Sequence, residues 1–176
     1  MVMQRTMTIS EFLALPESKP GLEYFNGRVI QKPVTNADHI KIVWRLSAAF
    51  HDYASVHGGR GGPEGSVAIT SDHAEPDVLL PDFAFWAEGK EMGSYPLSVP
   101  TIAVEVRSPS QTMAAQRGKC EFYVAHGVDE AWLFDPESRS VEIFGPEGAR
   151  GTLSGDETIT SRTLPGFKAE LAPLFD

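Results

Sequence analysis

The sequence has little of several features that would place it in a specialised class. It contains one cysteine, Cys120, so it can form no internal disulfide and offers no set of thiolates for a metal. No apolar run approaches the roughly 18 residues that a membrane-spanning helix needs. Residues 1–7 lack the apolar core of a secretion signal. We therefore expect a cytoplasmic protein with no membrane partner.

Positive charge is also scarce. The chain carries 15 Lys and Arg against 24 Asp and Glu, which gives a formal net charge of −9. Tight, sequence-independent DNA binding draws most of its free energy from Lys and Arg side chains that release counterions from the phosphates. The sequence has no such global positive field and no Lys/Arg run, which argues against a strong, indiscriminate DNA binder. A metal-dependent enzyme with a specific substrate is compatible with this charge.

The remaining composition is that of an ordinary globular domain. Hydrophobic residues make up 41% of the sequence and charged residues 22%, so neither a disordered nor a fibrous class is indicated. A length of 176 residues is enough for a sizeable hydrophobic core. No repeat, linker or low-complexity segment divides the chain. We predict a single domain over residues 1–176.

Helix and turn signals are clear at several positions. Asn26-Gly27, between two apolar stretches, is typical of a β-hairpin with a type I′ turn. A largely buried helix is expected to begin at Asn36 or Asp38 and to end near residue 56. A second helix is predicted from about residue 112 to 126, before Gly127.

Strand signals lie between and after these helices. Apolar segments rich in β-branched and aromatic residues predict strands at about 66–70, 78–87, 101–107, 131–135, 140–144 and 158–161. The glycine-rich stretch 58–65 is expected to be a loop. Strands with flanking helices predict a mixed α/β sheet in one domain.

Two acidic residues stand inside these apolar strands. Asp82 lies in the run 80–86, and Glu105 lies in the run 101–108. A carboxylate is costly to bury unless it is paired or bound to a metal. Because side chains alternate between the faces of a strand, the two acids would converge if their strands were neighbours. Oxygen ligands of this kind suit Mg²⁺ or Mn²⁺, so Asp82 and Glu105 are candidate metal ligands of a phosphodiesterase site.

A basic residue follows on the next predicted helix. Lys119 could orient or deprotonate a metal-bound water and stabilise charge on a phosphate. Asp82 follows Pro81, and Asp77 follows Pro76 in a second Pro-Asp pair, so Asp77 is an alternative to Asp82 as the candidate metal ligand. A solvated acid at the start of a strand explains Asp77 better.

The ordered set of motifs resembles the Uma-two family, a group assigned as restriction endonucleases within the PD-(D/E)XK nuclease superfamily. The resemblance runs from about residue 9 to residue 175. Its motifs are segments 24–30, 81–85, 104–110, 127–132 and 164–167, together with His39, Lys119 and Tyr123. It implies a restriction-endonuclease-like core, in which helices flank a mixed central β-sheet and an additional hairpin precedes it. It also implies a homodimer that hydrolyses DNA phosphodiester bonds with Mg²⁺ or Mn²⁺.

The resemblance also implies roles for individual residues. Asp82 and Glu105 match the metal-binding acids of the motif, and Lys119 matches a motif lysine that has moved from the strand to the following helix. Glu23, in the early hairpin, matches an acid that orients water or binds a second ion. The implied catalytic set is therefore Glu23, Asp82, Glu105 and Lys119. For Glu23, an ion pair with Arg28 across the hairpin is the alternative.

The sequence departs from the family pattern at two positions. Arg107, two residues after Glu105, stands where the superfamily lysine would otherwise lie. Arginine stays protonated and cannot act as a base, so Arg107 is a candidate for binding substrate phosphate or for pairing with an acid. Ala115 replaces an acid that many members carry before the helix lysine. Two other functions therefore stay open: a binding or regulatory protein without turnover, and a metal-dependent hydrolase of small phosphoesters.

Overall fold

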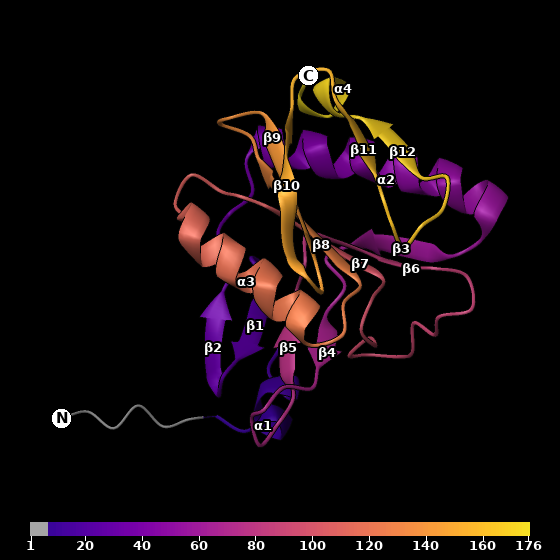
Figure 1. The fold of residues 1–176 in the computed structure, drawn as a ribbon. Helices are drawn as coiled ribbons and strands as arrows, with labels where there is room; N and C mark the ends of the chain where they lie inside the picture. The colour runs from indigo at the N-terminus through magenta and orange to yellow at the C-terminus, as the bar shows by residue number, and fades with distance from the viewer. Residues whose placement is uncertain (1–6) are drawn as a thin grey trace.

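The computed structural model describes residues 7–176, and residues 1–6, part of the segment considered as a secretion signal, lie outside the described part. A six-stranded sheet forms its centre, in the order β10-β9-β8-β7-β6-β3 (Figure 1). β7 and β8 run parallel, and the other neighbouring pairs are antiparallel. The strands are β3 (Arg60–Pro63), β6 (Phe83–Trp86), β7 (Ile102–Val106), β8 (Glu130–Asp135), β9 (Ser140–Gly145) and β10 (Gly148–Ser154).

Two long helices cover the opposite faces of this sheet. α2 (Ala37–His57) and α3 (Met113–Ala125) lie on different sides of it (Figure 1). Alternation along the strands divides the core accordingly. Val104 belongs to the cluster that contains Phe50 of α2, whereas Leu133 belongs to the cluster that contains Tyr123 of α3. The predicted mixed sheet flanked by helices is confirmed.

A smaller antiparallel sheet, in the order β2-β1-β5-β4, adjoins the central one. It comprises β1 (Leu22–Phe25), β2 (Arg28–Gln31), β4 (Val67–Ile69) and β5 (Asp77–Leu79). The short helix α1 (Ile9–Leu13) packs on it through Phe12, against Tyr24 and Val78. β11 (Thr158–Thr160), β12 (Lys168–Glu170) and the terminal helix α4 (Leu171–Phe175) complete the core on the α2 side. No helix within residues 7–176 combines the length and apolarity needed to cross a membrane.

The local signals at turns and helix starts are confirmed. Asn26 and Gly27 have φ values of 49° and 71°, as a type I′ turn between β1 and β2 requires. Asn36 caps α2, because its side chain accepts a hydrogen bond from the backbone N–H of His39. Gly127, with a φ of 100°, follows the end of α3.

Three local predictions are wrong. The single strand predicted over 78–87 is two strands in different sheets, because the chain changes sheets at residues 80–82, where Pro81 has no N–H for a ladder. The loop predicted over 58–65 contains β3, which pairs with β6. The α2 helix is less buried than predicted, since Ile40 and Trp44 are 59% and 70% exposed.

Candidate active site

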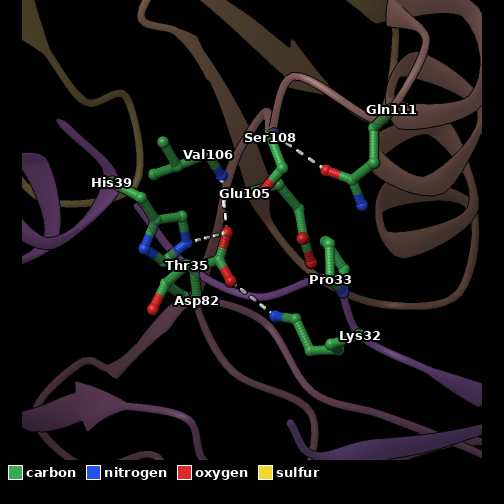
Figure 2. Close-up of a pocket in the computed structure, with 9 residues that line it drawn as sticks. All are labelled: Lys32, Pro33, Thr35, His39, Asp82, Glu105, Val106, Ser108 and Gln111. Atoms are coloured by element: carbon green, nitrogen blue, oxygen red, sulfur yellow. Dashed lines mark hydrogen bonds and ion pairs between the residues drawn. The ribbon is translucent and has the colours of Figure 1, made fainter. Parts of the chain in front are cut away.

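Asp82 lies where the chain passes from the smaller sheet into the central one. Its backbone N–H donates to the carbonyl of Val104 at 2.9 Å. Its Oδ1 lies 2.5 Å from Lys32 Nζ, and its Oδ2 accepts the Val106 N–H at 2.7 Å and lies 3.0 Å from His39 Nε2 (Figure 2). Burial alone would raise the pKa of Asp82, but the Lys32 ammonium and His39 hold it well below its usual range. Asp82 is therefore ionised at neutral pH.

Glu105 lies in the middle of β7, beside Asp82. β6 and β7 are antiparallel neighbours with Phe83 opposite Val104, so the next pair of positions is Asp82 and Glu105. Both carboxylates line the same cavity, and both residues are buried, with 4% and 2% exposure. The convergence that the sequence predicted for neighbouring strands is therefore present.

The hydrogen bonds of Glu105 come from α3. Its Oε1 lies 2.9 Å from Lys119 Nζ and accepts the Tyr123 hydroxyl at 2.9 Å. Burial raises the pKa of Glu105 above its usual value, although the Lys119 and Lys32 ammonium groups oppose that shift. Its Oε2 accepts no hydrogen bond from the described residues, so this oxygen can accept a further donor or a cation.

Lys119 joins Glu105 to Glu23. Its Nζ lies 2.6 Å from Glu23 Oε1, which also accepts the backbone N–H of Leu80 at 2.8 Å. Glu23 therefore pairs with Lys119 and not with Arg28. Burial disfavours the ammonium form, but Glu105 and Glu23 raise the pKa of Lys119 well above its usual value. The raised pKa keeps Lys119 protonated, so it favours a role as a fixed positive charge over a role as the base that deprotonates a water.

The site faces a cavity lined by the segment between β2 and α2, by the start of α2, by Asp82, and by the end of β7 with the loop that follows it (Figure 2). Glu23 and Lys119 are not among the residues that line it, and they connect to it through Glu105. Ion pairs thus join Glu23, Lys119 and Glu105, and Asp82 shares the cavity with Glu105. The lining residues are Lys32, Pro33, Thr35, His39, Asp82, Glu105, Val106, Ser108 and Gln111.

Two residues of this site were missed or underrated by sequence reasoning. Lys32 follows the edge strand β2 in an irregular segment, and its contact with Asp82 spans 50 positions of the chain. No local sequence pattern predicts such a contact. His39 did carry a signal, because it shares the helical spacing of Ile42 and Leu46 on the buried stripe of α2. A histidine on that stripe needs a polar partner, and Asp82 supplies it.

Arg107 is engaged outside this cavity. Its Nε donates to Asp135 Oδ1 at 2.8 Å, and its Nη2 lies 2.5 Å from Glu137 Oε2. These hydrogen bonds raise the pKa of Arg107. The structure shows the predicted pairing of Arg107 with acids. These acids do not belong to the site, because Asp135 is the last residue of β8 and Glu137 follows that strand. A contact with substrate phosphate stays a prediction.

Asp77, the alternative motif acid, is neither solvated nor directed to the cavity. It is 1% exposed, and its carboxylate accepts the Asn26 N–H at 2.6 Å and the Ser71 hydroxyl at 2.8 Å. The prediction of a solvated turn acid is wrong, because Asp77 holds the hairpin turn against β5. Asp82 therefore remains the acid of the Pro-Asp motif that reaches Glu105.

The donor atoms suit a hard divalent cation, although no closed cage is formed. Within residues 7–176, no group of three or more His, Cys, Asp and Glu side chains is arranged to hold a metal. Mg²⁺ commonly takes only one or two carboxylates and completes its shell with water and substrate oxygens. Asp82 and Glu105 meet that smaller requirement. The Lys32 ammonium donates to Asp82 Oδ1 and to the Leu80 carbonyl oxygen, so these two oxygens already bind a cationic group.

Known proteins resemble this chain in sequence pattern and in fold. Residues 9–172 match the model of the Uma2 family, described as "Putative restriction endonuclease", which is the family that the sequence motifs resemble. The structure is similar to the crystal structure of "a putative nuclease belonging to DUF820" from Anabaena variabilis, with a TM-score of 0.82 and 22% identity. The likeness covers 96% of this chain and 97% of the other, and it establishes the fold. No curated protein matches the sequence. Because the family model spans nearly the whole chain, the chain belongs to the Uma2 family.

Proposed function

We propose that this chain is a metal-dependent endonuclease that hydrolyses DNA phosphodiester bonds. The observation that carries the proposal is that Asp82 and Glu105 line one cavity, that Lys119 and Glu23 are joined to Glu105 by ion pairs, and that all three acids are buried. Burial of three charged acids is costly to the stability of the fold, and acids with shifted pKa values beside a cavity are typical of catalytic sites. Membership of a family of nucleases supports the same reaction class.

Each residue has a role that its contacts support. Asp82 and Glu105 Oε2 would hold Mg²⁺ or Mn²⁺, which lowers the pKa of a bound water and neutralises charge on a phosphate. His39 and the Val106 N–H orient the Asp82 carboxylate. Lys119 supplies a fixed positive charge behind Glu105. Glu23 positions Lys119 and so acts through it.

The test combines calorimetry of Mg²⁺ and Mn²⁺ binding with nicking of supercoiled plasmid on the same samples. The wild-type chain is expected to bind the ion and nick DNA, and Asp82→Asn and Glu105→Gln are expected to lose both. Asp129→Asn is the matched control, because Asp129 is a half-exposed acid paired with Lys90. A wild-type chain that binds no ion even at several millimolar would refute the proposal.

A hydrolase of small phosphoesters is the second candidate. The formal charge of −9 repels a long polyanion, which is less of a handicap for an enzyme that acts on small phosphoesters. Metal-dependent hydrolysis of bis-p-nitrophenyl phosphate with intact plasmid would select this candidate. Metal binding without turnover of either substrate would select a binding or regulatory protein. The homodimer stays a prediction that light scattering in solution would test.

A further inference from the structure

Lys32 has no role in the proposed reaction, yet it makes the shortest contact with Asp82. Its Nζ lies 2.5 Å from Asp82 Oδ1 and 2.6 Å from the Leu80 carbonyl oxygen, and its side chain is 12% exposed. Both partners are hard oxygen atoms of the kind that Mg²⁺ takes as ligands. Figure 2 shows the ammonium approaching Asp82 from the side away from His39, where the Glu105 carboxylate is also directed.

The buried charges around this ammonium do not balance. Glu23, Asp82 and Glu105 supply three negative charges, and Lys32 and Lys119 supply two positive ones, with histidine counted as neutral. A divalent ion that joined Lys32 would leave the cluster with a net positive charge. A divalent ion that replaced Lys32 would leave it neutral. Because unbalanced charge is costly in a buried site, replacement is favoured.

The position of Lys32 in the fold permits such a replacement. It follows β2, an edge strand whose residues are all exposed, and it precedes an irregular segment that leads to α2. The lysine side chain is a flexible stem with a strongly hydrated ammonium. Rotation about that stem can move the charge from the cavity to solvent without unpairing β1 from β2.

We propose that Lys32 is a tethered cation that holds the metal position and leaves it when a divalent ion binds. The inference rests on the proposed function, since it presupposes an ion at Asp82 and Glu105. Lys32 then lowers the affinity of Asp82 and Glu105 for the ion, and it serves as the counter-ion of these buried acids when no divalent ion is bound. The divalent ion therefore binds at Asp82 as the Lys32 ammonium moves from Asp82 to solvent.

Calorimetry with Mn²⁺ on the wild-type chain and Lys32→Met tests the exchange. Removal of the competing ammonium is expected to tighten binding about tenfold or more, the amount that a hydrogen bond to a charged group contributes to an equilibrium constant. Lys168→Met is the matched control, because Lys168 is exposed on β12, and its affinity is expected to equal that of the wild type. Equal or weaker binding by Lys32→Met overturns the inference. Failure of both proteins to bind Mn²⁺ overturns the proposed function as well.

A labelling experiment on the wild-type chain does not depend on the folding of a variant. The reactivity of each lysine toward an amine-acylating reagent is measured by mass spectrometry, with and without saturating Mg²⁺. Labelling of Lys32 is expected to rise severalfold with the ion, while Lys119 stays protected by Glu23 and Glu105. Unchanged protection of Lys32 in protein shown by calorimetry to bind Mg²⁺ overturns the exchange.

Discussion

Asp82 and Glu105 are both buried, but their surroundings stabilise their charged forms to different degrees. Both oxygens of Asp82 are held by protein donors, so its pKa is lowered despite burial. Glu105 is held through one oxygen, and burial prevails, so its pKa is raised. The charge of Glu105 therefore depends strongly on the cation beside it. In the structure that cation is Lys119.

Replacement of Lys119 by Met should destabilise the fold strongly. Glu105 and Glu23 would lose the ammonium that they share, and breaking a buried ion pair typically costs about 3–5 kcal/mol. Urea unfolding at pH 7 measures the change. The Glu23→Gln substitution in the Lys119→Met background should restore part of the loss, because it removes one unpaired charge. Arg117→Met is the control, because Arg117 lies on the same helix and is half-exposed where it pairs with Glu142 of β9, so a smaller loss is expected.

Replacement of Arg107 by Ala should destabilise the fold in a pH-dependent way. Burial acts to raise the pKa of Asp135, but hydrogen bonds from Ser138 and Arg107 lower it overall. A lowered pKa means that the Asp135 carboxylate stabilises the fold above its unfolded pKa of about 4 and loses that effect as the pH falls through the folded pKa. The loss in Arg107→Ala is expected to be about 1–2 kcal/mol at pH 7.

The pH series separates a structural from a substrate-binding role for Arg107. Unfolding free energies of wild type and Arg107→Ala should converge as the pH falls below 4 toward the lowered pKa of Asp135. If Arg107 serves the fold alone, the folded variant keeps its plasmid-nicking activity. A raised KM for DNA in a variant of unchanged stability would instead assign Arg107 to the substrate.

At the scale of elements, sequence signals succeeded where one short segment determines the structure. Asn26-Gly27 fixes a turn through its own backbone preference, and Asn36 starts a helix by capping its own first turn. The position of acids in apolar segments also predicted that Asp82 and Glu105 are buried with partners, because a buried carboxylate is tolerated only when it is paired or bound to an ion. These signals need no knowledge of distant residues.

Signals failed where a distant partner decides the structure. β3 is rich in glycine, which disfavours a strand, but it pairs with β6 along its full length. Gly61 is required there because a Cβ at this position would meet the Ala84 carbonyl oxygen at 2.5 Å. The contact of Lys32 with Asp82 was unpredictable for the same reason, since it joins two segments only through the tertiary fold.

The two glycines of β3 provide a matched test of this close approach. Gly61→Ala should destabilise the fold by about 1–3 kcal/mol, because the methyl group would overlap the Ala84 carbonyl and Phe85. Gly62→Ala should be neutral or slightly stabilising, because nothing lies within 4 Å of the added Cβ and the unfolded chain loses entropy. Thermal unfolding of the two variants compares them directly. Equal losses at both positions would contradict the role assigned to Gly61.

At the scale of the whole molecule, the site forms only when both sheets and both long helices are assembled. Glu23 comes from the smaller sheet, Glu105 from the central sheet, and Asp82 from the link between them. His39 comes from α2 and Lys119 from α3. A partly folded chain therefore has no site, and the stability of the cluster and of the fold are linked.

The net charge of the whole molecule predicts that DNA binding depends on a divalent ion. The chain carries a formal charge of −9, and the buried cluster is itself net negative, so phosphates are repelled in the absence of metal. Fluorescence anisotropy of a short duplex should show weak binding in EDTA and tighter binding with Ca²⁺, a hard divalent ion.

Two controls assign that gain to the site. An NaCl solution of matched ionic strength should not reproduce it, because screening acts on all surface charges alike. Asp82→Asn should abolish the gain from Ca²⁺ while leaving the weak binding in EDTA unchanged, because it removes a ligand of the ion. Tight binding in EDTA that weakens steeply with NaCl would contradict the prediction. It would mean that a local basic surface, and not the ion at Asp82 and Glu105, holds the phosphates.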